Sequence, residues 1–349
     1  MIDRWFISAV ADDRYLYWIT EIGSHFMRMN LEDGKAEYMH PAVSGVIGAC
    51  SAALCIYEGN VFYVINRGEK LAIYNLRENK IKLIHMGLER LYLNMYCYAG
   101  VEKDNLIIVP THGNCTVYVN INTELVQTYS IAESIKSNSI MQYFSLNANV
   151  VDGNVNLVSV TTNQYLAYSI LEKKIIVKKN LPKKSGKVIN YIPFNNGIIM
   201  INSDNRIMFW DFTNCRILCE LNEKEGKYMA LHESNGIVWI MPTYGKDIYQ
   251  YTLDTGKLKK FQNYPEEYKY TAPENMGKYW GKCTERKKTY FAMHSGTMIF
   301  CIDNDESRGK FIEVKWPEVR QDIEELKYKK ETLLESDITL KQYIQNIIY

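Results

Sequence analysis

The residues that could carry out chemistry are few and lie far apart in the 349-residue chain. None of the histidines belongs to an HxH, HxxxH or HExxH pair, the spacings at which neighbouring imidazoles bind one metal ion. No GxSxG, GxxxxGK[S/T] or GxGxxG stretch occurs, so neither a nucleophile elbow nor a phosphate-binding loop is marked. We therefore expect no cofactor and no metal site, and the residues of any catalytic activity stay unknown.

Three short segments share a chemistry that suits ligand recognition. They are Pro110-Thr111-His112-Gly113, Pro242-Thr243-Tyr244-Gly245 and Met293-His294-Ser295-Gly296. Each places a polar or aromatic side chain within two residues of a glycine, where the backbone can turn sharply. We predict ligand-binding roles for Arg67, His112, Tyr244 and His294. The alternative stays open, because hairpin tips are polar through solvent exposure alone.

The elements that hold these segments are short strands that recur along the first 316 residues. Turn residues that tolerate a positive φ come directly before an apolar β-rich run, as in Gly59-Asn60 before VFYVI and Asn235-Gly236 before IVWIM. A second turn follows each run after a similar interval. Its Gly or Asn recurs every 40 to 51 residues, and we expect a left-handed backbone there. These positions are Gly23, Gly68, Gly113, Asn163, Asn205, Gly245 and Gly296.

A third turn follows a strand that ends in a polar residue and a hydrophobe, as in RMNLEDGK and YQYTLDTGK. Each repeat therefore reads as four strands, a to d. One small twisted sheet cannot cover its own faces, so such units pack face to face around an axis. The sequence predicts an all-β, seven-bladed β-propeller of four-stranded antiparallel blades, with six or eight blades possible if one end is misjudged. The expected blades are 5–42, 49–87, 94–132, 140–181, 187–223, 227–264 and 277–316.

At the level of the single repeat, the pattern resembles the YVTN and quinoprotein-type propeller repeats. This resemblance implies the fold and says almost nothing about activity. Propellers of this kind commonly bind ligands on the face that carries the b–c and d–a loops, around the central channel. His112 and His294 could face each other there, but the sequence marks no carboxylate beside them.

Two segments depart from the repeat. Residues 178–187 form a basic connection between the fourth and fifth blades, which is either a solvated loop or a patch that contacts anions. Residues 317–349 have the pattern of a helical C-terminal tail, opened by Pro317, with Ser336-Asp337 as the cap of a second helix. The tail either packs on its own propeller or is a docking element for another chain.

The overall composition limits the kinds of partner and the compartment that we expect for this protein. Forty-one basic residues against 40 acidic ones give no overall field for nucleic acid or an anionic membrane. The beginning of the chain does not resemble a signal peptide, and no apolar run is long enough to span a bilayer. The eight cysteines form no CxxC pair and suit a reducing compartment, so we expect a cytoplasmic protein.

We predict a non-catalytic scaffold that binds a protein, peptide or small ligand on the b–c loop face. The alternatives are a propeller enzyme, either a lyase or a hydrolase, with its site over the channel, and a structural subunit tied into a complex by its C-terminal helices.

Overall fold

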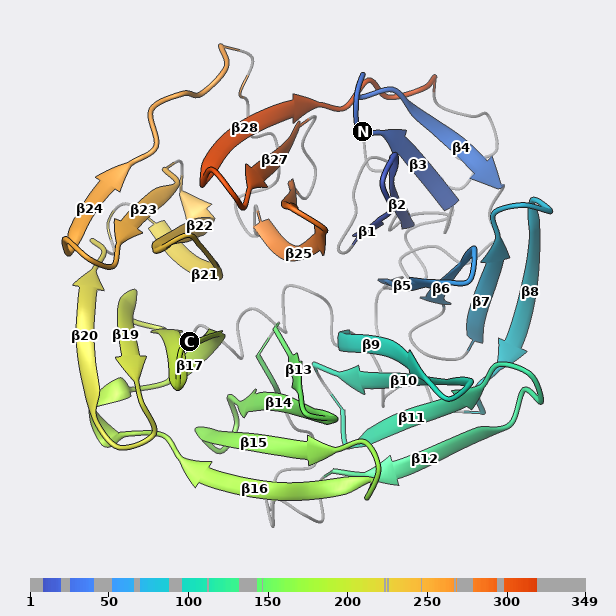
Figure 1. Cartoon of the computed structure of the whole chain (residues 1–349), viewed down its shortest axis with the longest axis horizontal. Coiled ribbons are helices and arrows are strands. Elements are labelled where there is room, and N and C mark those ends of the chain that lie inside the picture. The colour runs from blue at the N-terminus through green and yellow to red at the C-terminus, as the bar shows by residue number, and fades with distance from the viewer. Residues whose placement is uncertain are drawn as a thin grey trace, which may run out of the picture. The chain divides into compact units, whose positions relative to one another are not determined.

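A computed structural model describes residues 9–19, 26–40, 52–65, 70–87, 96–111, 113–131, 143–145, 147–222, 224, 226–245, 247–266, 268, 279–293 and 298–318. Their strands form seven four-stranded antiparallel sheets, each built from consecutive strands (Figure 1). The chain is thus an all-β, seven-bladed β-propeller, as the repeat predicts. The predicted C-terminal tail, and with it the choice between packing and docking, lies outside the described residues from position 319 onward. No described helix is long and apolar enough to cross a membrane.

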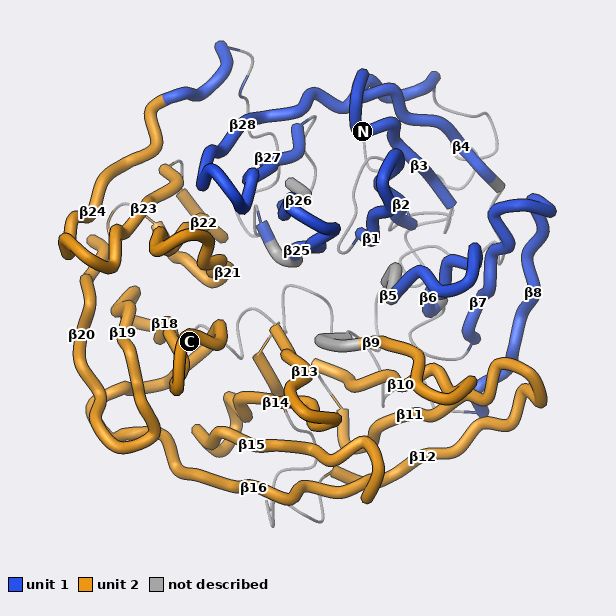
Figure 2. Tube along the Cα trace, viewed as in Figure 1, with its two compact units in different colours: residues 1–95, 263–340 blue, residues 96–262, 341–349 orange. Residues whose placement is uncertain are grey.

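The chain divides into two compact units, residues 1–95 with 263–340 and residues 96–262 with 341–349 (Figure 2). The first unit contains blades one, two and seven. Blade one is β1 (Ala9–Ala11), β2 (Tyr15–Ile19), β3 (Phe26–Asn30) and β4 (Ala36–His40). Blade two is β5 (Ala52–Tyr57), β6 (Asn60–Ile65), β7 (Lys70–Asn75) and β8 (Lys80–His85). Blade seven is β25 (Tyr279–Glu285), β26 (Lys288–Met293), β27 (Met298–Asp303) and β28 (Arg308–Glu313).

The second unit contains blades three to six. Blade three is β9 (Tyr96–Glu102), β10 (Asn105–Pro110), β11 (Cys115–Asn120) and β12 (Val126–Ser130). Blade four is β13 (Asn149–Val151), β14 (Asn154–Ser159), β15 (Gln164–Ser169) and β16 (Lys174–Asn180). Blade five is β17 (Val188–Phe194), β18 (Gly197–Asn202), β19 (Arg206–Trp210) and β20 (Cys215–Glu220). Blade six is β21 (Gly226–Ser234), β22 (Ile237–Gly245), β23 (Tyr249–Thr252) and β24 (Lys257–Lys260).

The turns between strands b and c match the expected backbone only in part. Asn163 and Asn205 have φ values of 52° and 60°, the left-handed conformation that the sequence predicts. Gly245 has a φ of 120°. At Gly113 the prediction is wrong, because φ is 159° and the backbone is nearly extended. Gly23, Gly68 and Gly296 lie outside the described residues.

The turns between strands c and d are more regular. In every blade one residue of this turn has a positive φ, and in blade two the turn closes by a hydrogen bond from Asn79 N to Asn75 O (3.0 Å). A polar side chain at the end of strand c stabilises it, as Asn75 Oδ1 does by accepting the backbone N–H groups of Arg77 and Glu78. The residues with positive φ are Gly34, Asn79, Glu124, Lys173, Phe212, Gly256 and Ser307.

The c–d turns of blades one, four and five contact strand d of the neighbouring blade, or the chain just after it, within the same unit. The turn of blade one bonds to the chain just after β28, through Ala36 N to Lys315 O (3.0 Å) and Lys315 N to Gly34 O (2.8 Å). The turn of blade four donates from Lys173 Nζ to Tyr129 Oη on strand d of blade three (2.5 Å). The same contact therefore joins successive blades with different chemistry at each junction.

At the junction between blades four and five, the lysine comes from strand d and the aromatic ring from the c–d turn, the reverse of the Lys173–Tyr129 contact. Here strand d of blade four supplies the cation, and Lys179 Nζ lies 4.7 Å from the ring centroid of Phe212 in the next c–d turn. Tyr165 completes the contact, with its ring centroid 5.0 Å from that of Phe212. Such cation–π pairs stabilise a partly desolvated junction by about 0.5–2 kcal/mol.

The seam between the first and last blades is an ordinary blade junction. All four described strands of blade seven come from the C-terminal part of the chain, so the N-terminus contributes none of them. Trp18 and Met29 of blade one share a buried apolar cluster with Ile299 and Cys301 of blade seven. Burying these side chains removes apolar area from water, which is the main force that holds one blade to the next.

Gly34 provides a test of the turn-to-blade contact. A Cβ atom at this position would lie 2.1 Å from Glu313 O, and φ is +73°. Gly153 has a similar φ of +71°, and a methyl group there would have nothing within 4 Å, so Gly153→Ala measures the backbone strain alone. We expect Gly153→Ala to cost about 1 kcal/mol and Gly34→Ala at least about 2 kcal/mol, measured by denaturant unfolding. Equal losses would show that the turn does not pack closely on blade seven.

Candidate functional site

The sequence-predicted site residues are only partly described. Tyr244 lies at the end of β22, with a half-buried side chain. Arg67, His112 and His294 fall outside the described residues, so their ligand-binding roles stay predictions. The described parts of the b–c loops belong to blades three to six, all within the second unit, and positions 112 and 246 of these loops lie outside the described residues.

The loops of blades four to six and the connections beside them form one continuous set of contacts, which we call the b–c platform. It comprises residues 160–163, 181–187, 202–206, 226–227 and 244–245. The connection from blade four to blade five carries a short 3₁₀ helix, η3 (Lys183–Ser185), which places Lys183 and Lys184 at the surface. The platform belongs to the face on which the sequence predicts binding.

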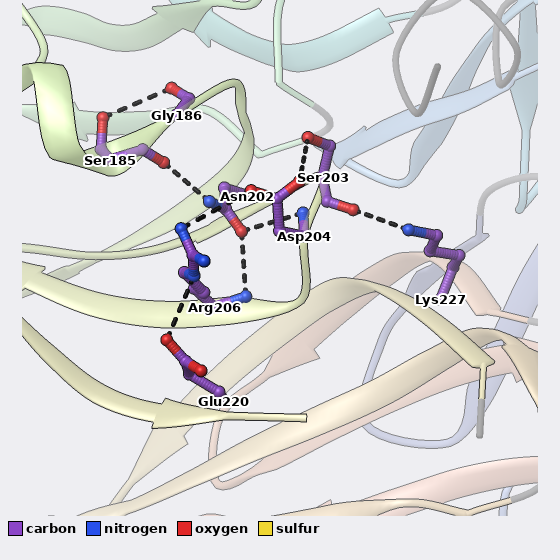
Figure 3. A network of polar contacts seen from close by, with 8 residues as sticks. All are labelled: Ser185, Gly186, Asn202, Ser203, Asp204, Arg206, Glu220 and Lys227. Atoms are coloured by element: carbon purple, nitrogen blue, oxygen red, sulfur yellow. Dashed lines mark hydrogen bonds and ion pairs between the residues drawn. The ribbon is translucent and has the colours of Figure 1, made fainter. Parts of the chain in front are cut away.

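Asn202 is the centre of the platform and is fully buried (Figure 3). Its side-chain nitrogen donates to Ser185 O (2.8 Å), and its Oδ1 accepts the backbone N–H groups of Asp204 (3.0 Å) and Arg206 (2.9 Å). One side-chain amide thus provides hydrogen-bond partners for the backbone of both the b–c turn of blade five and the end of η3. Because a buried amide without partners is costly, this arrangement holds both loops in one conformation.

The η3 end of this network leaves no room for a side chain. Gly186 has a φ of +63°, and a Cβ there would lie 3.0 Å from Asn202 Nδ2. Ser185 is buried, and its hydroxyl donates to Pro182 O (2.7 Å). The sequence Pro182-Lys183-Lys184-Ser185-Gly186 is therefore a defined turn, and only its two lysines are exposed to solvent.

The left-handed asparagines of the b–c turns tie each blade to the next. Asn205 donates from Nδ2 to Gly226 O (2.7 Å) and accepts from Tyr228 N (3.3 Å) at Oδ1, both on strand a of blade six. Asn163 bonds in the same direction toward blade five, accepting from Val188 N (3.3 Å). Asparagine serves two purposes here, since it tolerates positive φ and its amide reaches the neighbouring backbone.

The acidic groups of the platform region are neutralised locally. Arg206 Nε lies 3.1 Å from Glu220 Oε1, and its NH1 lies 3.7 Å from Asp204 Oδ2. Lys227 donates from Nζ to Ser203 O (2.9 Å). Burial lowers the pKa of Lys187 from its ordinary value. The exposed Lys183 and Lys184 have no hydrogen-bond or ion-pair partner for their side chains among the described residues.

The threonines of the two related Pro-Thr segments are packing residues. Thr111 and Thr243 are both fully buried, and neither hydroxyl has a hydrogen-bond partner among the described protein atoms. Of these two segments, the structure describes only one predicted ligand-binding side chain, that of Tyr244. Tyr244 pairs with Lys227 in the β21–β22 ladder, which places it at the edge of the platform.

The platform combines a fixed backbone with exposed cationic side chains. The described residues include no group of three or more His, Cys, Asp and Glu side chains that could hold a metal ion. The loops are fixed by amide and backbone bonds, and the exposed groups on the η3 turn are lysines. A rigid backbone that presents cationic side chains can recognise a carboxylate or phosphate without large ordering costs.

Sequence reasoning found the loops and missed the residue that organises them. Asn202 follows the apolar run IIMI at the end of a strand, where its type suggests only another turn residue. The signal that could have found it is the close sequence N-S-D-N-R, in which two asparagines flank a turn of two residues. Their different tasks depend on the position of η3, which no local pattern reveals.

Comparisons with known proteins agree on the fold alone. No protein-family model and no curated protein matches the sequence. A catalytically inactive variant of virginiamycin B lyase from Staphylococcus aureus, solved with quinupristin, is similar with a TM-score of 0.61 at 14% identity, over 84% of this chain and 93% of that one. The computationally designed protein Ika8 has a TM-score of 0.56 at 9% identity, over 89% and 87%. Sqt1 from Saccharomyces cerevisiae also has 0.56 at 9%, over 89% and 86%.

Replacing Asn202 tests whether one amide orders both loops. In Asn202→Ala the N–H groups of Asp204 and Arg206 and the carbonyl of Ser185 lose their partner. We expect faster amide hydrogen exchange in both 182–187 and 203–206, and a loss of stability of about 2 kcal/mol. Ser203→Ala is the control, because that hydroxyl makes only a 3.3 Å contact with Asp204. Faster exchange in one loop only would contradict a shared organiser.

Proposed function

We propose that the protein is a non-catalytic binding propeller whose b–c platform recognises an acidic segment of another protein. The observation that carries this proposal is a pair of exposed lysines, Lys183 and Lys184, on a turn that the Asn202 amide fixes in place. A partner that binds a preordered surface avoids the entropy cost of ordering it. This favours recognition of a specific segment over a diffuse attraction.

Charge supports an acidic partner. The segment from Lys173 to Lys187 contains seven lysines and no acidic residue, while the carboxylates of Asp204 and Glu220 are already paired with Arg206. Carboxylates of a partner could therefore meet the ammonium groups of Lys183 and Lys184, which have no ion-pair partner among the described residues. Each such contact is charge-assisted and stronger than a neutral hydrogen bond.

A protein segment is favoured over nucleic acid by the balance of the whole chain. The net charge is only +1, so the chain as a whole has no field that attracts a polyanion, and the potential of the platform lysines falls off within about 8–10 Å in physiological salt. Two half-buried tyrosines lie beside the platform, Tyr143, whose backbone bonds to Val160 and Thr161, and Tyr244. Single-stranded nucleic acid is commonly bound on rows of exposed aromatic rings.

Site-specific photo-crosslinking can identify the partner and the face together. A photoreactive residue at position 184 or 244 should capture the same protein in cells of the source organism, whereas one at Lys259, an exposed residue of β24, should not. The captured peptide should be rich in Asp and Glu. Equal capture from position 259, or capture of RNA or DNA instead of protein, would contradict the proposal.

Charge reversal then tests the chemistry with the purified partner. We expect Lys183→Glu/Lys184→Glu to weaken binding at least about tenfold and to reduce its salt dependence, since two attractive contacts become repulsive. The matched control is Lys257→Glu/Lys259→Glu, which reverses two exposed lysines of the same unit on strand d of blade six. Unchanged affinity in the first variant, or turnover of a small molecule in place of binding, would support the enzyme alternative.

A further inference from the structure

A groove of about 690 Å³ opens between blades seven and one, both within the first unit. One wall is the a–b turn of blade one with residues 30–32, and the other is the a–b turn of blade seven with the strand residues behind it. Its size is that of a small-molecule site. The residues that line it are Asp12, Asp13, Arg14, Asn30, Leu31, Glu32, Glu285, Arg286, Lys287, Lys288, Tyr290 and Lys310.

Most of the acidic groups in the groove are already engaged. Asp12 caps its own turn, accepting the backbone N–H groups of Arg14 and Tyr15 at Oδ1 and the hydroxyl of Tyr17 at Oδ2. Arg286 takes up the next two carboxylates, because its guanidinium lies 2.5 Å from Asp13 Oδ2 and 3.7 Å from Glu285 Oε1. The Arg286–Asp13 pair also links blade seven to blade one at the edge of the groove.

Two lysines of the blade-seven wall have no such partner. Lys287 pairs with Asp305, but the side chains of Lys288 and Lys310 make no hydrogen bond or ion pair with any described residue. They lie on one face of the sheet, since Lys288 is two residues from Tyr290, and Tyr290, Cys301 and Lys310 are opposite one another on β26, β27 and β28. Burial raises the pKa of the Cys301 thiol to about 11, and both lysines act against that rise, which places both ammonium groups near one sulfur atom.

Lys288 differs from the equivalent residues of blades two and three. There the first residue of strand b is an asparagine that accepts a hydrogen bond from an asparagine on strand c, Asn75 to Asn60 (3.0 Å) and Asn120 to Asn105 (3.4 Å). In blade seven the residue opposite Lys288 is Asp303, and its Oδ1 already accepts the backbone N–H groups of its own turn. The side chain of Lys288 therefore lines the groove instead of closing the sheet.

We propose that this groove binds a small multivalent oxyanion, such as a diphosphate or a polycarboxylate, between Lys288 and Lys310. Two cationic groups without internal partners favour a ligand with at least two negative charges. The nearly buried ring of Tyr290 forms the apolar part of the wall between them. Glu32 is the one lining carboxylate for which the described residues offer no partner, and it repels the ligand from the blade-one wall. This site is independent of the b–c platform.

Isothermal titration of the full chain with pyrophosphate, citrate and inorganic phosphate tests this site, with ionic strength held constant by sodium chloride. We expect saturable one-to-one binding of pyrophosphate or citrate, weakened about tenfold or more in both Lys288→Gln and Lys310→Gln. Glu32→Gln should tighten binding, because it removes a like charge. The comparison of pyrophosphate with citrate tells whether phosphate or carboxylate chemistry is preferred.

Lys259→Gln is the matched control, since Lys259 takes the place of Lys310 in blade six: it lies opposite Gln250 as Lys310 lies opposite Cys301. It should leave the dissociation constant unchanged. The proposal is overturned if neither pyrophosphate nor citrate binds saturably. It is also overturned if Lys259→Gln weakens binding as much as Lys310→Gln, or if Glu32→Gln weakens it.

Discussion

Each unit depends on one constraint: a four-stranded sheet must bury the apolar side chains of its faces against the neighbouring blades. At three junctions the c–d turn of one blade also contacts strand d of its neighbour, or the chain just after it. The turn needs a residue with positive φ, and every blade supplies one in its own sequence. The contact itself varies from backbone hydrogen bonds at Gly34 to a Lys173–Tyr129 hydrogen bond and a Lys179–Phe212 ring contact. These turn contacts add to the burial of apolar area, which is the main force between neighbouring blades.

At the other end of the strands, the turns of the b–c platform also contact the neighbouring blade. Asn163 and Asn205 connect each turn to strand a of the next blade, and Asn202 joins a turn to a connection between blades. Because these bonds are made by side-chain amides with no charge, they fix the loops without consuming the lysines. Binding capacity and rigidity are thus carried by different residues, which is what a preordered recognition surface requires.

Much of the fold could be predicted from the sequence because each strand and turn has a short local sequence pattern, and the same patterns recur in every blade. Asn235 and Gly236 both have positive φ, as their residue types suggest, and the apolar runs between turns are the buried strands. The predicted pair Gly59-Asn60 is displaced by one residue, because Glu58 and Gly59 have the positive φ and Asn60 begins β6. The prediction failed at Gly113, where a glycine marks a nearly extended residue, because glycine permits a left-handed backbone without requiring one. The candidate site was harder to predict, because its function depends on which side chains lack an internal partner, and a sequence does not show partners. Thr243 reads as part of a polar loop and is buried, whereas Lys288 reads as part of a weak turn and lines a groove.

The most direct test of the recognition surface is an experimental structure of the full chain with its captured partner. We predict that acidic side chains of the partner lie over the turn that carries Lys183 and Lys184, and that the backbone of 182–187 and 203–206 is the same with and without the partner. A partner bound elsewhere, or a platform that rearranges on binding, would contradict the claim that a preordered b–c platform is the recognition surface.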